Sequence, residues 1–324
     1  MSNYSNTSSV PLSIAVFLAT DHYDHDDATI SVTTLIKPLR QIILGARVPT
    51  GDASVELVQM TASRMGTAIH DGIERAWLNN HRSAMKLLNL PEKVIDRVLV
   101  NPEPHQLYEG CIPIYLERRS KKQVGKHLVS GKFDFVGDGR LEDFKSTSVF
   151  SAMNNNNDEK YVEQGSIYRW LNQDIITKDN MAIQFIFTDW SAVRARTETN
   201  YPPQRIQERV LPLKSVAETE QFVISKLNQI DTHWDTPEEQ LPLCSDKDLW
   251  RSLPVFKYYK NPEKTARSTK NFDNLHDARL KLIEDGNVGM VKEVPGQVTA
   301  CKYCNAFSIC SQKDTLIANG DLIL

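Results

Sequence analysis

The residues best suited to carry out chemistry lie between Gly131 and Thr147, in the segment GKFDFVGDGRLEDFKST. Asp134 falls in one predicted strand. Asp143 and Lys145 stand two residues apart in the next, so their side chains project from one face of a sheet. Two carboxylates and an ammonium group would then converge across a hairpin. Oxygen ligands of this kind hold Mg²⁺, which polarises a phosphate and acidifies a bound water, and a lysine can stabilise the transition state. The segment therefore suits metal-dependent phosphodiester hydrolysis.

The same segment also fits a surface hairpin in which Asp143 and Lys145 merely form an ion pair, worth about 0.2–1 kcal/mol. Taken alone, the segment supports the two interpretations equally. Other segments favour the first, because residues four apart share one face of a helix and can present both side chains to a common site. Two pairs in predicted helices have this spacing: His70 with Glu74, and Gln164 with Tyr168.

The order of these motifs resembles that of a known nuclease family. GxxxH, GxxD, DxK and QxxxY follow one another along the chain. This succession is similar to the RecB-type members of the PD-(D/E)xK superfamily, which also include the AddAB nuclease domains and the CRISPR adaptation exonucleases. The resemblance covers roughly residues 31 to 190, and no motif is missing. The matching residues are Gly66 and His70, Gly131 and Asp134, Asp143 and Lys145, and Gln164 and Tyr168.

The resemblance implies a role for each matching residue. Lys145 would be the catalytic lysine, and Gln164 and Tyr168 would orient the active site or the DNA strand near it. Glu142 is excluded as a ligand, because strand alternation points it to the face opposite Asp143. Three side chains and one main-chain carbonyl would hold Mg²⁺ or Mn²⁺: His70, Asp134, Asp143 and the carbonyl of Phe144.

By the same resemblance the chain is a metal-dependent deoxyribonuclease, an exonuclease of phage type, acting in phage or bacterial recombination, repair or genome processing. DNA would be its substrate, with a single-strand annealing protein, a helicase or another recombination factor as its partner. Two alternatives remain: an inactive nucleic-acid-binding or scaffold module with this fold and metal site, and a small zinc-containing interaction protein. The complete set of metal-site residues argues against the first, and the motif order argues against the second.

Three of the five cysteines are packed between Cys301 and Cys310, in CKYCNAFSIC. Such clustering indicates a metal site in a reducing compartment, such as the cytoplasm, rather than a disulfide framework. Cys301, Cys304 and Cys310 look like the trailing three-cysteine cluster of the iron-sulfur members of the family. Either a [4Fe-4S] cluster or Zn²⁺ needs a fourth ligand, and ligand count does not separate the two.

The fourth cysteine ligand departs from the pattern of the iron-sulfur relatives. There it lies upstream of the histidine motif, just before a proline, whereas the corresponding stretch IKPLRQ has Lys37. No cysteine precedes Cys111, which falls in a predicted strand and is better explained as a core residue. We therefore expect Cys244, in LPLCSDKDLW, to be the fourth ligand.

The overall composition does not identify a binding partner, so partners must be inferred from local sequence features. A hydrophobic fraction of 40%, a charged fraction of 24% and a net charge of -3 are those of an ordinary globular protein, not of a strongly basic nucleic-acid binder. No run approaches the about 18 apolar residues of a membrane-spanning helix. We expect Pro11 to Thr20 to be a buried strand or short helix rather than a signal peptide. Two basic runs, 118–126 and 257–270, the latter with Tyr258 and Tyr259, fit nucleic-acid binding or solvated loops equally.

The elements that must position these residues alternate along the chain. Periodicity predicts helices over 62–79, 159–171 and 217–230, and another starting near Ser31 that Pro38 interrupts. Strands within 111–147 form an antiparallel meander with a turn at Gly137-Asp138-Gly139, and a further strand covers 181–190. The stripe of Met65, Ile69, Ile73 and Trp77 is expected in the core.

The predicted architecture is an α/β nuclease core, a mixed central sheet flanked by helices, with a cysteine-metal extension packed on it. We expect an N-terminal extension over 1–30, the core over 31–230, and the extension over 231–324. Two polar stretches are predicted to be solvated: DHYDHDD at 21–27, and the asparagine loop at 154–157.

Overall fold

The computed structural model describes residues 3–20, 28–49, 54–153 and 157–324. The stretch 21–27 and most of the loop 154–157 lie outside the described residues. The chain divides into two compact units, one formed by residues 1–36 and 50–228 and the other by 37–49 and 229–324. The first unit carries the nuclease-like motifs, and the second carries four of the five cysteines.

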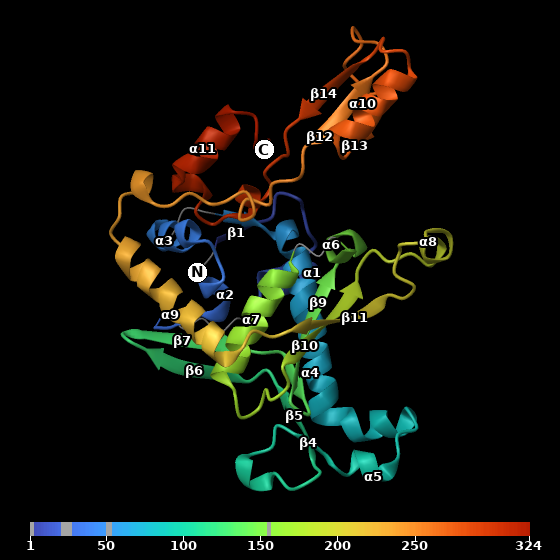
Figure 1. Cartoon of the computed structure of the whole chain (residues 1–324). Helices are drawn as coiled ribbons and strands as arrows, with labels where there is room; N and C mark the ends of the chain where they lie inside the picture. The colour runs from blue at the N-terminus through green and yellow to red at the C-terminus, as the bar shows by residue number, and fades with distance from the viewer. Residues whose placement is uncertain (1–2, 21–27, 50–53, 154–156) are drawn as a thin grey trace. The chain divides into compact units, whose positions relative to one another are not determined.

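A six-stranded mixed sheet forms the centre of the first unit (Figure 1). The pairs β4–β5 and β9–β10 are parallel, and the other neighbouring pairs are antiparallel. With helices packed on it, this sheet confirms the mixed α/β class. In spatial order its strands are β11 (Ile206–Pro212), β10 (Asn180–Phe187), β9 (Arg140–Thr147), β8 (Phe135–Gly137), β5 (Ile112–Leu116) and β4 (Val98–Val100).

The predicted meander is present, but its first two strands bend and continue into a second sheet. β6 (Arg119–Val124) and β7 (His127–Lys132) pair with each other, and β7 pairs with β2 (Ile30–Ser31). The turn between β8 and β9 is confirmed. Asp138 and Gly139 adopt φ of 48° and 81°, as a two-residue hairpin loop with the right twist requires.

Helix α4 (Thr61–Leu87) packs against β9 and covers a core of Val98, Ile114, Leu116 and Phe135. Trp77 and the partly buried Phe144 lie against this core. Met65, expected there as well, is 47% exposed, so the predicted stripe begins one turn later. The packing leaves the middle of α4 beside the strand that carries the DxK motif.

Helix α7 (Asp158–Leu171) packs against β6, β7, β10 and β11. Its buried residues include Ile167, Tyr168 and Trp170, and Gly165 lets it approach the sheet, since a Cβ there would clash with Met181. Shorter elements complete the sheet-bearing part of this unit: α2 (Val32–Leu35), α5 (Glu92–Ile95), η2 (Pro104–Gln106), α6 (Val149–Met153) and α8 (Ala192–Thr197).

The N-terminal apolar run forms the short helix α1 (Leu12–Ala19), of which only Ala15 and Leu18 are buried. They pack with Leu57 in a small cluster beside the two-stranded pair β1 (Asn3–Ser5) and β3 (Ser54–Glu56). The turn η1 (Leu57–Met60) leads directly into α4. Among the described residues, no helix has both the length and the apolar character needed to cross a bilayer.

In the second unit, Pro38 separates α2 from α3 (Leu39–Arg47), as predicted. Helix α9 (Val216–His233) links the units, and α10 (Leu275–Glu284) packs on a three-stranded sheet of β12 (Val255–Tyr259), β13 (Lys270–Phe272) and β14 (Met290–Val294). The cysteine-bearing region contains η3 (Glu238–Gln240), η4 (Ala300–Tyr303), η5 (Phe307–Ile309) and α11 (Ser311–Ala318).

Candidate active site

The bend between the six-stranded sheet and the sheet of β2, β7 and β6 creates the candidate site. Asp134 lies at this bend, between β7 and β8, and the register Phe135 to Glu142 places it across from Asp143 at the next position. Beyond that position β9 has no partner on this side, because β7 has turned into the other sheet. The N–H and C=O of Phe144, which point to the same side of the strand, are therefore free for side chains.

The side chains of Asp134 and His70 interact with these main-chain groups. The N–H of Phe144 donates to Oδ2 of Asp134 at 3.0 Å. The carbonyl oxygen of Phe144 lies 3.0 Å from Nε2 of His70, whose ring also meets the Phe144 ring edge-on. Asp134 and His70 are thus held at one point of β9, as two of the sequence motifs require.

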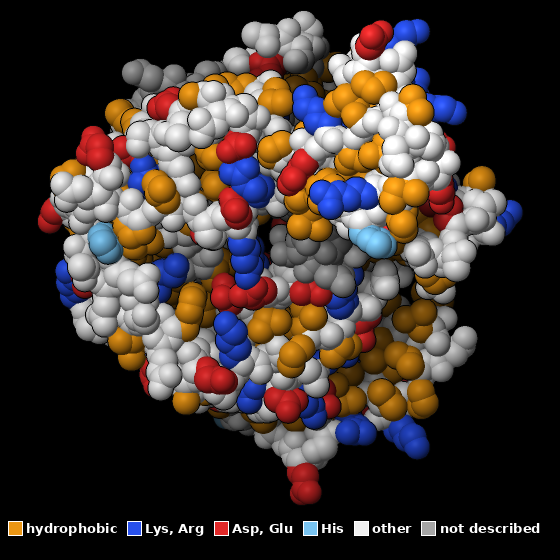
Figure 2. Space-filling view, turned by 45° about the horizontal axis from the view of Figure 1, so that its top comes forward, with side chains coloured by type: hydrophobic (Ala, Val, Ile, Leu, Met, Phe, Trp, Pro, Cys, Tyr) orange, Lys and Arg blue, Asp and Glu red, His pale blue; other side chains and the backbone are white. Residues whose placement is uncertain are grey.

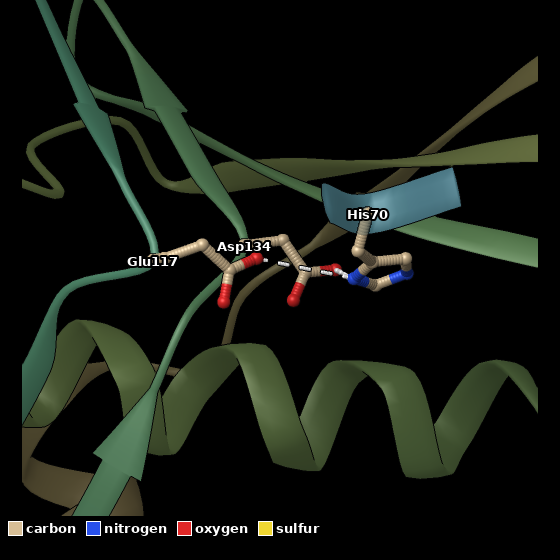
Figure 3. Close-up of side chains that lie close together, drawn as sticks. All are labelled: His70, Glu117 and Asp134. Atoms are coloured by element: carbon tan, nitrogen blue, oxygen red, sulfur yellow. Dashed lines mark ion pairs between the residues drawn. The ribbon is translucent and has the colours of Figure 1, made fainter. Parts of the chain in front are cut away.

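His70 reaches the strand from α4. Its Nδ1 lies 3.6 Å from Oδ2 of Asp134, and both side chains are half-buried (Figure 3). Gly66, one turn earlier on α4, allows this approach, since a Cβ there would stand 3.3 Å from Oγ of Ser146 on β9. The GxxxH spacing therefore combines close helix–strand packing with a histidine aimed at the bend.

Asp143 and Lys145 share a face of β9, as strand alternation predicted. Nζ of Lys145 lies 2.5 Å from Oδ2 of Asp143. Asp143 is 3% exposed. Glu142 points to the other face, as strand alternation predicted, where it pairs with Arg140 and accepts from Gln184.

Electrostatics link these groups. Burial, with the nearby carboxylate of Asp143, raises the pKa of Asp134 to about 7. Burial alone would lower the pKa of Lys145, but the carboxylates of Asp143 and Asp134 outweigh it, and the pKa is raised. Lys145 therefore remains protonated at neutral pH.

Helix α7 presents the QxxxY pair. Nε2 of Gln164 donates to the hydroxyl of Tyr168 at 2.9 Å, and Tyr168 is buried. Tyr161, on the same helix, lies under the ammonium group of Lys145, 5.8 Å from Nζ to the ring centroid. Burial raises the pKa of Tyr161. Tyr161 thus connects α7 to the DxK pair.

Sequence reasoning missed two residues at this site. Tyr161 had a usable signal, because it stands three and seven residues before Gln164 and Tyr168 and shares their helical face. Glu117 had none. It follows β5 at the bend, and its Oε1 lies 4.0 Å from Nδ1 of His70. Its place depends on where the long hairpin bends, which local periodicity does not reveal.

The second unit brings four cysteines near one another. Cys244 and Cys301 pack on a cluster of Leu249, Val298, Leu316 and Leu322. Burial raises the pKa of Cys244 to about 12, and the neighbouring Asp248, Cys310 and Cys304 add to the effect. Burial also raises the pKa values of Cys301 and Cys304. Cys111 lies in the first unit, and all five described cysteines are free thiols.

The surroundings of these cysteines are specific. Gln312 holds the main chain of Cys244 from both sides, because its Oε1 accepts from the N–H and its Nε2 donates to the carbonyl, each at 2.9 Å. The buried Arg40 of α3 donates from Nε to Sγ of Cys310 at 3.4 Å and pairs with Glu238. Segments that are distant in the sequence therefore converge on the cysteines.

Several side chains of the two basic runs are buried or paired in the structure. Tyr258 and Tyr259 are buried, and the hydroxyl of Tyr258 donates to Asp285, so these two rings are not available to stack on bases. In the first run, Lys122 is engaged by Glu220 and by the Trp170 ring. Lysine and arginine side chains are interspersed with acidic ones over the face in Figure 2.

Comparison with known proteins found no matching family model and no match among curated proteins. Among solved structures, the crystal structure of SSO0001 aligns over 70% of this chain and 89% of its own, at 13% identity and a TM-score of 0.41. A phage-related exonuclease from Haemophilus somnus 129PT aligns over 64% of this chain and 93% of its own, at 14% identity and a TM-score of 0.29. Neither similarity is sufficient to assign a fold family or an activity.

Proposed function

We propose that this chain is a divalent-cation-dependent deoxyribonuclease with a RecB-type PD-(D/E)xK core. One observation carries the proposal: the imidazole of His70 and the carboxylate of Asp134 lie 3.6 Å apart at the bend beside β9, and the ion pair of Asp143 and Lys145 lies near enough to act on the pKa of Asp134. A surface hairpin with an incidental ion pair would not bury Asp143 or attract a histidine from α4.

The donor set fits a hard divalent cation such as Mg²⁺ or Mn²⁺, with His70, Asp134 and Asp143 as the side chains that would hold it. By the resemblance of the motifs, the carbonyl of Phe144 is a further candidate ligand, and it lies 3.0 Å from Nε2 of His70. When bound, the cation would polarise a phosphate and lower the pKa of a water molecule. The raised pKa of Asp134 supports this fit, since an ion would compensate the buried carboxylates.

The remaining residues would act on the phosphate and on one another. Lys145, kept protonated by Asp143 and Asp134, would neutralise charge on the phosphate in the transition state. Tyr161 packs beneath its ammonium group and would restrict where Nζ can move. The bonded pair of Gln164 and Tyr168 would orient the active site or the DNA strand near it.

The finer features of the activity rest on the resemblance of the motifs. They are an exonucleolytic mode, a role in phage or bacterial recombination, repair or genome processing, and a cytoplasmic location. A single-strand annealing protein, a helicase or another recombination factor would be the protein partner. DNA as substrate has separate support from exposed basic residues in β6 and its loop, including Lys121 and Lys126, which can contact phosphates.

In the second unit, we infer that Cys244, Cys301, Cys304 and Cys310 hold a metal cofactor, with [4Fe-4S] preferred over Zn²⁺. A zinc ion with Zn–S bonds of about 2.3 Å would draw its sulfurs within about 4 Å of one another. Among the described residues, no three cysteine sulfurs lie within 4.8 Å. The preference for [4Fe-4S] follows from the resemblance of Cys301, Cys304 and Cys310 to the trailing cysteines of the iron-sulfur members of the family.

The test is incubation of the full chain with end-labelled single- and double-stranded DNA, with Mg²⁺, Mn²⁺ or a chelator. We expect cation-dependent degradation from a DNA end, abolished in Asp143→Asn. DNA that is bound but not cut under any of these conditions would refute the nuclease and support an inactive binding module. Labelling the two ends separately reveals the polarity, and a circular substrate separates exonuclease from endonuclease.

A further inference from the structure

Glu117 lies outside the four motifs, yet its carboxylate is turned toward the candidate site (Figure 3). Oε1 lies 4.0 Å from Nδ1 of His70, while Oε2 is held 2.5 Å from Nζ of Lys132. Over the described part of the chain, one group of three or more metal-binding side chains has all its ligand atoms within 4.8 Å, and it consists of His70, Glu117 and Asp134. The oxygen that Lys132 leaves free is the one that faces the histidine.

The main chain at the bend holds Glu117 in this position. Its N–H donates to the carbonyl oxygen of Asp134 at 3.1 Å, so the two acidic residues are tied together. Its φ of 49° is in the left-handed region, which non-glycine residues adopt uncommonly. Such a conformation persists where the surrounding structure imposes it, and it is frequent at functional sites.

The two nitrogens of His70 face different partners. A neutral imidazole has one N–H and one lone pair. With the N–H on Nε2, it donates to the carbonyl of Phe144 at 3.0 Å, and the lone pair lies on Nδ1, on the side of Asp134 and Glu117. Metal-binding histidines commonly donate their other N–H to a carbonyl in this way.

The charge of the neighbouring side chains would also be compensated by a bound cation. Three carboxylates, those of Glu117, Asp134 and Asp143, are accompanied by two ammonium groups, from Lys132 and Lys145. Oδ2 of the buried Asp143 lies 2.5 Å from Nζ of Lys145. When all three carboxylates are ionised, they exceed the two ammonium groups by one negative charge, which a bound divalent cation would offset.

We propose that Glu117 is a ligand of the divalent cation, through Oε1, together with Nδ1 of His70 and the carboxylate of Asp134. In this arrangement the carbonyl of Phe144 orients the imidazole through Nε2, and Lys132 positions Glu117 by holding Oε2. The inference rests on the proposed function, because the cation is the one that the nuclease requires. It extends the ligand set beyond the motif residues.

The test measures Mn²⁺ binding to the full chain by titration calorimetry without DNA, after removal of divalent cations. Glu117→Gln should weaken binding about 10-fold or more, as loss of a ligand or its close support typically does. Glu142→Gln is the matched control, because its side chain is 18% exposed against 16% for Glu117 and points to the other face of β9. Its affinity should equal that of the wild type.

A purely structural role for Glu117 would give a different result. If it served only to pair with Lys132, then Glu117→Gln and Lys132→Met would lower the metal-free melting temperature alike and leave Mn²⁺ affinity unchanged, and the proposal would be wrong. A ligand role predicts instead that Glu117→Gln keeps the metal-free melting temperature and loses most of the rise produced by Mn²⁺.

The outcome is separable from that of the nuclease assay. A wild-type chain that binds Mn²⁺ through Glu117 but cuts no DNA would refute the nuclease and support the ligand. Cation-dependent cleavage with unchanged Mn²⁺ affinity in Glu117→Gln would support the nuclease and refute the ligand role of Glu117. A wild-type chain that binds no Mn²⁺ would refute both.

Discussion

Gly131 lies directly against the ring of Tyr168, so that a Cβ on Gly131 would stand 3.0 Å from Cδ1 of the tyrosine. The glycine of the GxxD motif thus contacts the tyrosine of the QxxxY motif. The same Cβ would lie 2.6 Å from Cγ2 of Val32 and 2.9 Å from Cδ1 of Leu171. Two motifs that are separate in the sequence therefore share one packing contact, and α7 can approach β7 only because Gly131 has no side chain.

Gly131→Ala should destabilise the protein by about 1–3 kcal/mol, the usual cost of overpacking a buried site. The displaced Tyr168 should also reduce nuclease activity. Gly72→Ala is the matched control, because nothing lies within 4 Å of its Cβ and alanine favours a helix interior by about 0.5–1 kcal/mol. Denaturant unfolding measures both variants, and equal stability of the two would contradict the packing argument.

Asp143→Asn and Lys145→Ala should each lower the rate of DNA cleavage by about 10²-fold or more, the scale for removing one group that stabilises a transition-state charge. Lys145→Ala should leave Mn²⁺ affinity largely intact, whereas Asp143→Asn should weaken it, because only the carboxylate is a ligand. Glu142→Gln, one residue away on the opposite face, should retain activity. Single-turnover kinetics measure these rates, and wild-type rates in both active-site variants would remove the catalytic assignment.

The stability of the metal-free protein should depend on the ionisation of Asp134. Its pKa in the folded state is raised to about 7, above the value of about 3.9 in an unfolded chain. The stability that the protonated Asp134 contributes to the folded state is therefore fully present below pH 4 and is lost as the pH rises through 7. In a chelating buffer, Asp134→Asn should not lose stability in this way. Between pH 5 and pH 8 its free energy of unfolding should rise by on the order of 2 kcal/mol relative to that of the wild type.

Melting curves of the two chelated proteins across this pH range provide the measurement for Asp134. Adding Mn²⁺ should restore the wild type at high pH and leave Asp134→Asn unchanged, because the ion compensates the carboxylate. A difference between the two proteins that does not vary with pH would mean that Asp134 does not titrate in this range.

Cys301→Ser and Cys244→Ser should each reduce bound metal and lower the melting temperature by at least about 5 °C, because metal-binding free energy at such sites is largely folding free energy. Cys111→Ser is the control, since Cys111 lies in the other unit. Elemental analysis and the visible absorbance of purified protein distinguish iron-sulfur from zinc. Metal-free wild-type protein of equal stability would contradict the site.

Arg40→Met should destabilise the second unit by about 3–5 kcal/mol, the cost of leaving one partner of a buried ion pair alone. Arg40 is 2% exposed, pairs with Glu238, and donates to the carbonyls of Glu238 and Leu241. Arg40→Lys should recover little of this loss, because one ammonium group cannot replace the guanidinium fork. Thermal unfolding measures both, and a wild-type melting temperature for Arg40→Lys would argue that charge alone is sufficient.

The amino-acid sequence by itself determined the local geometry of the candidate site. The two-residue alternation of strand β9 put Asp143 and Lys145 on one face and Glu142 on the other, and Asp138-Gly139 predicted the turn that brings β8 beside it. These features follow from backbone periodicity and turn preferences, which act between residues close in the chain.

Only the tertiary structure decided which groups meet at the bend. Glu117 reaches His70 because the β5–β6 and β7–β8 segments pass from one sheet to the other at the same point. For the same reason the main chain of Phe144 is not paired with a strand on that side and contacts His70 instead. Tyr258, expected at the surface, is buried beside α10. Such contacts join residues far apart in the chain. They depend on which strands and helices pack together, and this is set by the cooperative burial of apolar surface rather than by any local pattern.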